Sequence, residues 1–304
     1  HLKTEGACIT PNGAMFKNDS QGFLPEMMET MYNERVIYKK RMLKAKREYE
    51  KTKDPKLVKE ISRCHNIQWA RKIALNSAYG AVGNQYFRYY DVRQASGITT
   101  AGQFIIRFIE SKVNEYLNTI LQTHDKIDYI VASDTDSIYV TLDKLVEKTC
   151  KGKTNDQICN FIDKVVSSRV EPFLDKCFGE LSDYTNAFKN CMVMKREVIA
   201  DKGIWVAKKR YMLNVLDEEG VRLADPKLKL MGIEAVKSST PQVCRGKIKD
   251  AIKIIMSKEE SDLHKFVLDF KKEFLKMSAE QISFPRSCNN IKKYKDSNNV
   301  FIKG

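Results

Sequence analysis

Apolar residues recur at helical spacing in the first part of the chain. From 25 to 49 they return every three or four positions, which predicts an amphipathic helix. The Asp54-Pro55 pair disfavours helix before the proline and permits it afterwards, so a second helix is predicted over 55–79, with its end at Gly80. Two long helices joined by a short turn make an antiparallel hairpin.

Further along the chain, short apolar runs alternate with helical patterns. A turn is predicted at 11–13 and an extended aromatic segment at 86–90. The predicted strands are short runs of apolar and β-branched residues: 127–132, 137–142, 192–200, 204–206 and 211–216. The predicted helices follow helical periodicity: 99–121, 155–178, one to about 256 with Thr240-Pro241 as its cap and first turn, and one from Ser261.

The composition is that of a globular protein. The chain has 304 residues and a mass of 35.1 kDa, with 42% hydrophobic and 30% charged residues, which argues against disorder and allows two or three modules. No run of 18 apolar residues occurs, which excludes a membrane-spanning helix and predicts no membrane partner. The first ten residues lack the layout of a signal peptide.

The net charge of +14 is concentrated in the predicted helical hairpin. Residues 21–84 contain 14 Lys and Arg against seven acids, about half of the whole excess. A localised positive field favours a polyanionic partner, although a basic surface also serves plain solubility. The eight cysteines form no C-x-x-C pair, so we predict reduced structural thiols in a reducing cytoplasm.

Two carboxylates follow the apolar strand predicted at 127–132. Asp134 and Asp136 are two residues apart, which on a strand places both side chains on one face. Neighbouring carboxylates repel unless a cation neutralises them, and Mg²⁺ commonly takes one or two carboxylates together with water and substrate phosphates. An ordinary turn between two strands uses the same residue types, and the D-x-D pattern also occurs in nucleotide-sugar transferases.

The predicted hairpin carries a second candidate site. Lys72, Asn76 and Tyr79 lie at i, i+4 and i+7 on one helix face, and Arg35 and Lys39 lie at i and i+4 on the preceding helix. If the helices pair antiparallel, the four donors converge on one anion such as a triphosphate, with the tyrosine ring against a base or sugar. A solvated basic face explains the same charges.

A third candidate segment is Lys208, Lys209, Arg210 and Tyr211, which leads into a predicted strand. Alternating cationic and aromatic residues at a sheet edge suit a nucleic-acid backbone. Lysines that protect an edge strand from aggregation give the same pattern.

Together these segments resemble the motifs of a known family. KIALNSAYGAVGN at 72–84, followed by QYFRYYD to residue 91, closely resembles the second conserved motif of family B DNA polymerases. DTDSIYV at 134–140 resembles their third motif, and KKRY at 208–211 resembles the segment that holds the primer terminus. Residues 114–118 and 226–241 are similar to replicative polymerases of T-even-type tailed phages. Three motifs in family order are far more specific than any one of them.

The resemblance implies an α+β fold with an antiparallel palm sheet backed by helices, a long antiparallel helical hairpin as fingers and a partial helical thumb. The implied divisions are a palm-edge segment at 1–20, fingers at 21–84, palm at 85–232 and an incomplete proximal thumb at 233–304. The implied reaction is addition of deoxynucleotides from dNTPs to a primer 3′-hydroxyl on primer-template DNA, by a phage replication protein in the cytoplasm of an infected bacterium.

The resemblance also implies a role for each candidate residue. Asp136 would ligate two catalytic Mg²⁺ ions, with Asp134 beside it as a weaker ligand and Glu197 as an acidic palm residue near the metals. Arg35, Lys39 and Lys72 would bind the triphosphate with Asn76 as a further contact, Tyr79 would lie against the nascent base pair, and Lys208 to Tyr211 would contact the primer-template.

The chain departs from the family pattern in two ways. Ala132-Ser133 stands where the third motif usually has Tyr-Gly, and no segment resembles the first motif, whose aspartate shares both metal ions. The exonuclease domain is also missing, so we expect a fragment or split subunit that is inactive alone and works with the N-terminal polymerase portion and a sliding clamp. A metal-dependent nucleotide-sugar transferase and a non-catalytic nucleic-acid-binding protein remain as alternatives.

Overall fold

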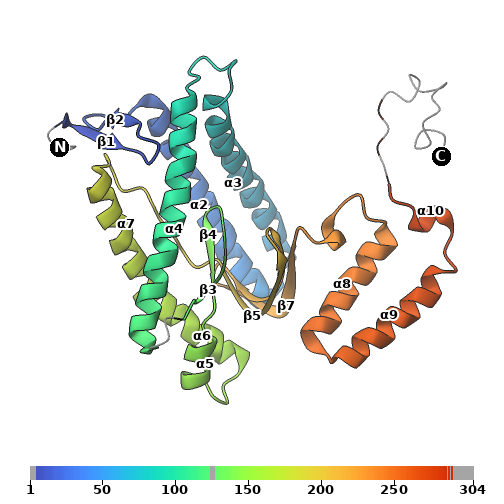
Figure 1. Ribbon diagram of the computed structural model, residues 1–304. Coiled ribbons are helices and arrows are strands. Elements are labelled where there is room, and N and C mark those ends of the chain that lie inside the picture. Colours follow the sequence, from blue (N-terminus) through green and yellow to red (C-terminus); the bar gives the residue numbers. More distant parts are fainter. Residues whose placement is uncertain (1–4, 124–126, 286, 288, 290–304) are drawn as a thin grey trace. The chain divides into compact units, whose positions relative to one another are not determined.

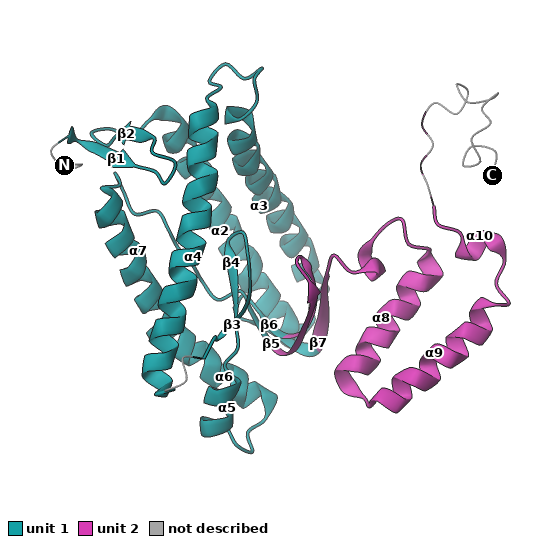
Figure 2. Cartoon of the chain, in the orientation of Figure 1, with its two compact units in different colours: residues 1–199, 216–225 teal, residues 200–215, 226–304 magenta. Residues whose placement is uncertain are grey.

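The computed structural model describes residues 5–123, 127–285, 287 and 289 (Figure 1). The chain divides into two compact units (Figure 2): one contains residues 1–199 and 216–225, the other residues 200–215 and 226–304. The first four residues of the expected palm-edge segment and nearly all of the expected thumb beyond 285 lie outside the described residues. No helix in the described part is long and apolar enough to cross a lipid bilayer.

The first unit contains the predicted helical hairpin, made of α2 (Phe23–Thr52) and α3 (Pro55–Val82). The Asp54 side chain accepts a hydrogen bond from the Lys56 backbone N–H at 2.9 Å, so this aspartate caps α3 directly before its proline. Ion pairs across the hairpin join Glu34 to Arg71 and Arg41 to Glu60, which fixes the helices as antiparallel neighbours. The prediction is confirmed, with each helix slightly longer than expected.

The aromatic segment at 86–90 is a succession of turns, so the prediction of extended chain there is wrong. The backbone N–H of Phe87 donates to the Asn84 carbonyl, and that of Tyr90 donates to the Phe87 carbonyl. Helix α4 (Val92–Leu121) then starts seven residues earlier than predicted, because Asp91 caps it by accepting from the next two backbone N–H groups.

Helix α4 supports the core of the first unit. Its buried side chains recur at helical spacing and pack against β3 (Ile130–Asp134) and α7 (Glu171–Thr185). The buried members of this cluster are Ile109, Val113, Leu117, Leu121, Tyr129, Ile130, Leu174, Cys177 and Phe178. The cluster therefore fixes the strand that ends at Asp134 onto the long helix.

The other elements of the first unit are short. Strand β3 pairs antiparallel with β4 (Ser137–Val140), and a bulge interrupts the pairing between Ile130 and Ala132. The predicted helix at 155–178 consists of α6 (Asn155–Val165), a π-helical turn (Val166–Val170) and α7, and it ends at Thr185. The remaining elements are α5 (Asp143–Thr149) and the antiparallel pair β1 (Ala7–Ile9) and β2 (Met15–Lys17), whose connection contains the predicted turn at 11–13.

A three-stranded sheet in the order β5 (Val198–Ala207), β6 (Arg210–Glu218) and β7 (Val221–Met231) supplies residues to both units. Two predicted strands, 192–200 and 204–206, are replaced by the single strand β5, and residues 192–197 have no regular structure. Strand β7 was not predicted, because its exposed stretch from Ala224 to Lys227 contains charges and a proline and has no apolar alternation.

The second unit has its own small core. Met212, Ile233, Ala235, Ile252 and Met256 are buried together, which packs α8 (Gln242–Ser257) against the turn of helix at Glu234–Val236. Helices α9 (Glu260–Phe274) and α10 (Ala279–Ile282) follow. The N-cap of α8 is Pro241 and has no side-chain cap, so the predicted capping role of Thr240 is wrong.

The fold class is α+β, as predicted, with long helices and antiparallel strands. The seven cysteines among the described residues are all free, and Cys288 lies outside them. Burial raises the pKa of the thiols of Cys64, Cys159 and Cys177, which keeps them protonated and inert. These thiols fit the predicted structural role.

Candidate active site

The two candidate metal-binding carboxylates lie at the tip of the β3–β4 hairpin. Asp134 pairs with Ser137 across the ladder, so Thr135 and Asp136 alone form the connection. The Asp136 backbone N–H donates to the Asp134 carbonyl at 2.7 Å, and Thr135 has a positive φ of 58°. A β-branched residue rarely adopts this conformation, and such strain is concentrated at functional sites.

This turn changes the relation expected between the two acids. Asp134 ends the strand and is half-buried, whereas Asp136 lies in the turn and is exposed, so they do not share a strand face as the spacing predicted. The Thr135 hydroxyl donates to Asp134 at 2.9 Å, and the Ser137 hydroxyl donates to Asp136 at 3.3 Å. The two carboxylates, separated by Thr135 in sequence, are therefore each oriented by a neighbouring hydroxyl.

Helix α4 connects this turn to the end of the helical hairpin. The Ser133 hydroxyl donates to Glu110 of α4 at 3.4 Å, and the Tyr79 hydroxyl shares a hydrogen bond with Thr99 of α4 at 3.2 Å. Thr99 and Glu110 are 11 residues apart, which is about three helical turns and about 16 Å along one face. One face of α4 thus contacts both candidate segments.

Glu110 is a residue that the sequence interpretation missed. Its contact with the β3–β4 hairpin is made through Ser133. Ser133 is one of the two positions where the sequence departs from the family's third motif. That departure was the available signal, because a serine hydroxyl at the strand end can donate a hydrogen bond and glycine has no side chain to do so.

The described residues do not form a closed metal cluster. No group of three His, Cys, Asp or Glu among them is arranged to hold a metal ion, so Asp134, Asp136 and Glu197 do not make one. Glu197 is exposed and lies in the irregular segment before β5, where its backbone carbonyl accepts from the Glu219 N–H. Two adjacent carboxylates fit a hydrated cation such as Mg²⁺, which commonly takes one or two protein carboxylates.

The candidate triphosphate residues lie on the two helices of the hairpin. Glu34 and Arg71 are joined at 2.6 Å, and because Arg35 and Lys72 are their sequence neighbours, these two cations lie at a similar level of the hairpin. Arg35 has a buried Nε donor without a hydrogen-bond partner, a group that an anion could satisfy. Asn76 is exposed near the far end of α3.

Lys39 forms a separate contact and does not join Arg35 and Lys72. Its ammonium group lies 2.6 Å from Glu219, in the turn between β6 and β7. The Arg47 guanidinium binds the carbonyls of Gly220 at 2.9 Å and Glu219 at 3.3 Å, so the same turn contacts α2 twice. The structure therefore does not bring all four predicted donors together.

A buried ion network anchors that turn. Asp217 is 3% exposed, accepts a hydrogen bond from the Gly220 backbone N–H at 2.9 Å and forms an ion pair with Arg196, which also binds Asp163 of α6. Arg222 lies 3.5 Å from the second Asp217 oxygen. Burial lowers the pKa of Arg196, but its bonds to the two aspartates outweigh burial and raise it, so the guanidinium stays charged.

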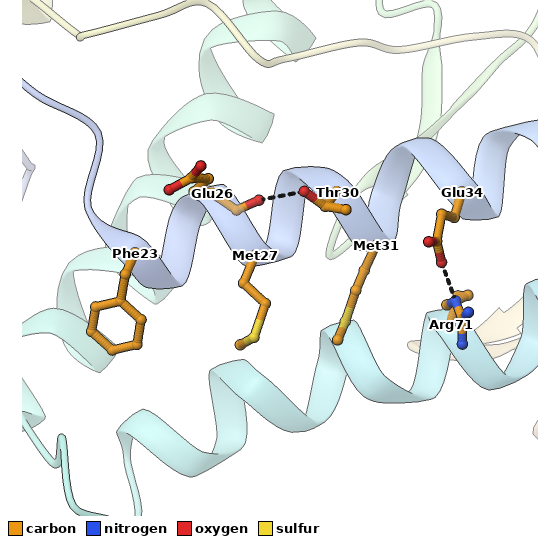
Figure 3. A pocket seen from close by; sticks show the side chains of 7 residues that line it. All are labelled: Phe23, Glu26, Met27, Thr30, Met31, Glu34 and Arg71. Atoms are coloured by element: carbon orange, nitrogen blue, oxygen red, sulfur yellow. Dashed lines mark hydrogen bonds and ion pairs between the residues drawn. The ribbon is translucent and has the colours of Figure 1, made fainter.

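A groove of about 500 Å³ lies between α2 and α3 (Figure 3). Figure 3 shows Phe23, Met27 and Met31 projecting from α2 toward α3, and the Glu34–Arg71 bond at one end. The other lining residues are Glu26 and Thr30. None of the predicted triphosphate-binding residues lines this groove, although two of its lining residues, Glu34 and Arg71, are the sequence neighbours of Arg35 and Lys72.

Comparison with known proteins identifies the family. The family model described as DNA polymerase family B matches residues 3–299. The chain belongs to DNA polymerase family B. This confirms the resemblance that the three sequence motifs indicated.

Two phage proteins are similar to this chain along most of its length. It is 37% identical to the DNA-directed DNA polymerase of Escherichia phage RB69 over 336 residues, covering 94% of this chain, and 36% identical to that of Enterobacteria phage T4 over 310 residues, covering 97%. The alignments cover 37% and 32% of those proteins, so the chain spans about a third of their length.

Archaeal proteins show a weaker similarity. A DNA polymerase of Pyrococcus glycovorans is 25% identical over 254 residues, covering 79% of this chain and 26% of that protein. The solved structure of the family B DNA polymerase from Pyrobaculum calidifontis aligns with a TM-score of 0.49 and 18% identity, covering 95% of this chain and 31% of that chain.

The KKRY segment of this family B chain spans the turn between β5 and β6 and the first two residues of β6. Lys208 and Lys209 are exposed in a turn where Lys209 has a positive φ of 61°. Arg210 forms an ion pair with Glu234 at 2.6 Å, and Tyr211 is buried with its ring stacked on Trp205. The lysines are thus the accessible members of the segment, and the tyrosine ring belongs to the interior.

Proposed function

We propose that this chain forms the nucleotide-adding part of a family B DNA polymerase of phage type. The reaction is transfer of a deoxynucleotidyl group from a dNTP to the 3′-hydroxyl of a primer paired with a DNA template. The observation that carries the proposal is the single face of α4, which contacts both Tyr79 at the end of the fingers hairpin and the strand that leads into the turn with the two carboxylates.

In this proposal Asp136 and Asp134 bind the catalytic Mg²⁺ ions. When bound, the metal would activate the primer hydroxyl and stabilise the departing pyrophosphate. The Thr135 and Ser137 hydroxyls orient the two carboxylates, and the strained turn holds them next to each other. The aspartate of the family's first motif would complete the ligand set, with Glu197 as an acidic residue near the metals.

The fingers hairpin binds the triphosphate in the same proposal. Lys72 and Arg35 supply charge at the level of the Glu34–Arg71 bond, and Asn76 adds a polar contact farther along α3. Lys39 joins them when it leaves Glu219. Tyr79, half-exposed and hydrogen-bonded to Thr99, presents its ring to the nascent base pair.

The remaining assignments follow from the family. Residues 1–20 belong to the palm edge, 21–84 to the fingers, 85–232 to the palm and 233–304 to the proximal thumb. Lys208 to Tyr211 contact the primer-template, chiefly through the two exposed lysines. The partners are the N-terminal polymerase portion and a sliding clamp, and the protein acts in the cytoplasm of an infected bacterium.

The test measures primer-template binding and primer extension in one buffer with Mg²⁺ and dNTPs. The chain is assayed alone and with a polypeptide that carries the family's first motif. We expect DNA binding by the chain alone, extension only in the mixture, and loss of extension but not of DNA binding in Asp136→Asn. Extension that survives Asp136→Asn would exclude the proposed metal site, and absence of DNA binding would exclude the proposed contact of this chain with primer-template DNA.

A further inference from the structure

Trp69 is a large aromatic residue on the exposed side of α3. Its side chain is 49% exposed, so it does not serve the core, although tryptophan is normally well buried. Its ring stacks on the His65 ring with centroids 6.0 Å apart and an interplanar angle of 18°. His65, Trp69 and Lys72 are spaced i, i+4 and i+7, so all three share one stripe of the helix.

The Lys72 ammonium group lies over this ring, 5.5 Å from its centroid. Tryptophan is the best partner for a cation–π contact, and the distance is within the range of such contacts. Lysine is a compact charge on a flexible stem, so a contact that restricts the stem reduces the entropy lost when the lysine binds a ligand.

The chemistry of this contact leaves the charge of Lys72 available. No carboxylate pairs with Lys72 anywhere in the described part of the chain, and the neighbouring Arg71 takes Glu34. A carboxylate partner would neutralise the lysine and compete with a phosphate, whereas an aromatic ring orients the ammonium and carries no negative charge. The ring can therefore keep Lys72 in place while a triphosphate binds.

We propose that Trp69 is a positioning residue for nucleotide binding, which holds Lys72 in the orientation that contacts the triphosphate. This inference rests on the proposed function, because it requires Lys72 to bind the nucleotide. His65 supports the ring from within the same stripe. Trp69 itself touches Lys72 and acts through it.

The test measures the affinity of the full chain for dTTP with Mg²⁺ by isothermal titration. We expect Trp69→Leu to weaken binding about two- to fivefold, the range of an exposed cation–π contact. Trp69→Phe and Trp69→Tyr should recover most of the loss, because they keep a ring in place. Ile73→Ala is the matched control, since Ile73 is 52% exposed on the same helix and should leave the affinity unchanged.

A double-mutant cycle separates positioning from a general structural effect. If Trp69 acts through Lys72, Trp69→Leu should have no further effect once Lys72→Ala is present. The chain has only two tryptophans, so Trp205→Phe leaves Trp69 as the single indole emitter. In that variant dTTP binding should change the emission of Trp69, since a triphosphate bound to Lys72 alters the electrostatic field at the ring.

The outcomes distinguish this inference from the proposed function. Two results would overturn the positioning role and leave the nucleotide site standing. In the first, Lys72→Ala weakens dTTP binding but Trp69→Leu has no effect. In the second, Trp69→Leu weakens binding equally with and without Lys72. Absence of dTTP binding by the parent chain, or full binding by Lys72→Ala, would overturn both. The role would be established if Trp69→Leu weakens dTTP binding, Trp69→Phe and Trp69→Tyr restore most of it, and Trp69→Leu has no further effect in Lys72→Ala.

Discussion

Lys39 and Lys72 lie on different helices of the same hairpin, and the structure holds them in opposite ways. Lys39 forms an ion pair with Glu219 at 2.6 Å, in a turn about 180 residues away in sequence, whereas Lys72 lies over a tryptophan three residues before it. A carboxylate must be exchanged for a phosphate before the lysine can bind a nucleotide, but a ring can stay in place. If the hairpin binds a triphosphate as proposed, Lys72 can contact it without losing a carboxylate partner, whereas Lys39 must first leave the β6–β7 turn.

The largest expected effect comes from removing the anchor of that turn. Asp217→Ala leaves the guanidinium of Arg196 buried with one partner fewer and frees the Gly220 N–H, so we expect a loss of about 3–5 kcal/mol in the free energy of unfolding. Urea denaturation measures it, with the exposed Asp225→Ala as control. A loss no greater than that of the control would mean that the network does not hold the turn.

A smaller effect is expected from Gly220, the residue of the turn that contacts Arg47. Its φ is +76°, and a Cβ there would lie 2.9 Å from the Arg47 Nη2. Gly220→Ala should be about 1 kcal/mol less stable than Gly152→Ala, because both strain the backbone but only the first displaces the Arg47 bonds. Thermal unfolding compares them, and equal stabilities would contradict the role of this contact.

The ion pair between Lys39 and Glu219 can be removed without disturbing the β6–β7 turn. Glu219→Gln releases Lys39, so the affinity for dTTP with Mg²⁺ should rise about two- to threefold, as expected for a partly exposed surface pair. The control is Glu180→Gln, which removes an exposed carboxylate of α7 that pairs with Lys176 at 3.8 Å. A lower affinity in Glu219→Gln would show that Glu219 positions Lys39 and does not compete for it.

The smallest expected effect is on acid stability and comes from Glu29, near the N-terminal end of α2. Hydrogen bonds from Lys189 and Gln21 lower the pKa of Glu29 below its ordinary value of 4.5. Because the folded pKa is depressed, this pair contributes stability above pH 4.5 that is lost as the pH falls through the folded pKa. Thermal unfolding from pH 6 to pH 3 should therefore show a slightly flatter acid limb in Glu29→Gln. An unchanged acid limb would mean that the pair does not stabilise this end.

The local features of the fold were predictable from the sequence. The Asp54-Pro55 signal placed the hairpin turn, helical periodicity gave α2, α3 and the end of α4, and the motif acids fell at a hairpin tip as predicted. These features depend on residues close together in the chain, where capping, proline geometry and periodicity act directly.

The parts that could not be predicted depend on distant residues. The partner of Lys39 is Glu219, the partner of Ser133 is Glu110, and the buried Asp217 is compensated by arginines on other segments. Strand β7 is polar where it is exposed, so it gives no apolar alternation, and the Asp91 cap outweighed the weak helical pattern at the start of α4. The sequence named most of the candidate residues, but their partners required the fold.

The most direct test of the difference between the two lysines is dTTP binding with Mg²⁺ to the parent chain, Lys39→Ala and Lys72→Ala. Loss of Lys72 removes a charge that needs no partner exchange, so we predict a loss of affinity of about tenfold or more, the range of a charge-assisted hydrogen bond. Lys39→Ala should lose clearly less, because part of its binding energy is spent on leaving Glu219. An equal loss in both variants, or a greater loss in Lys39→Ala, would contradict the account.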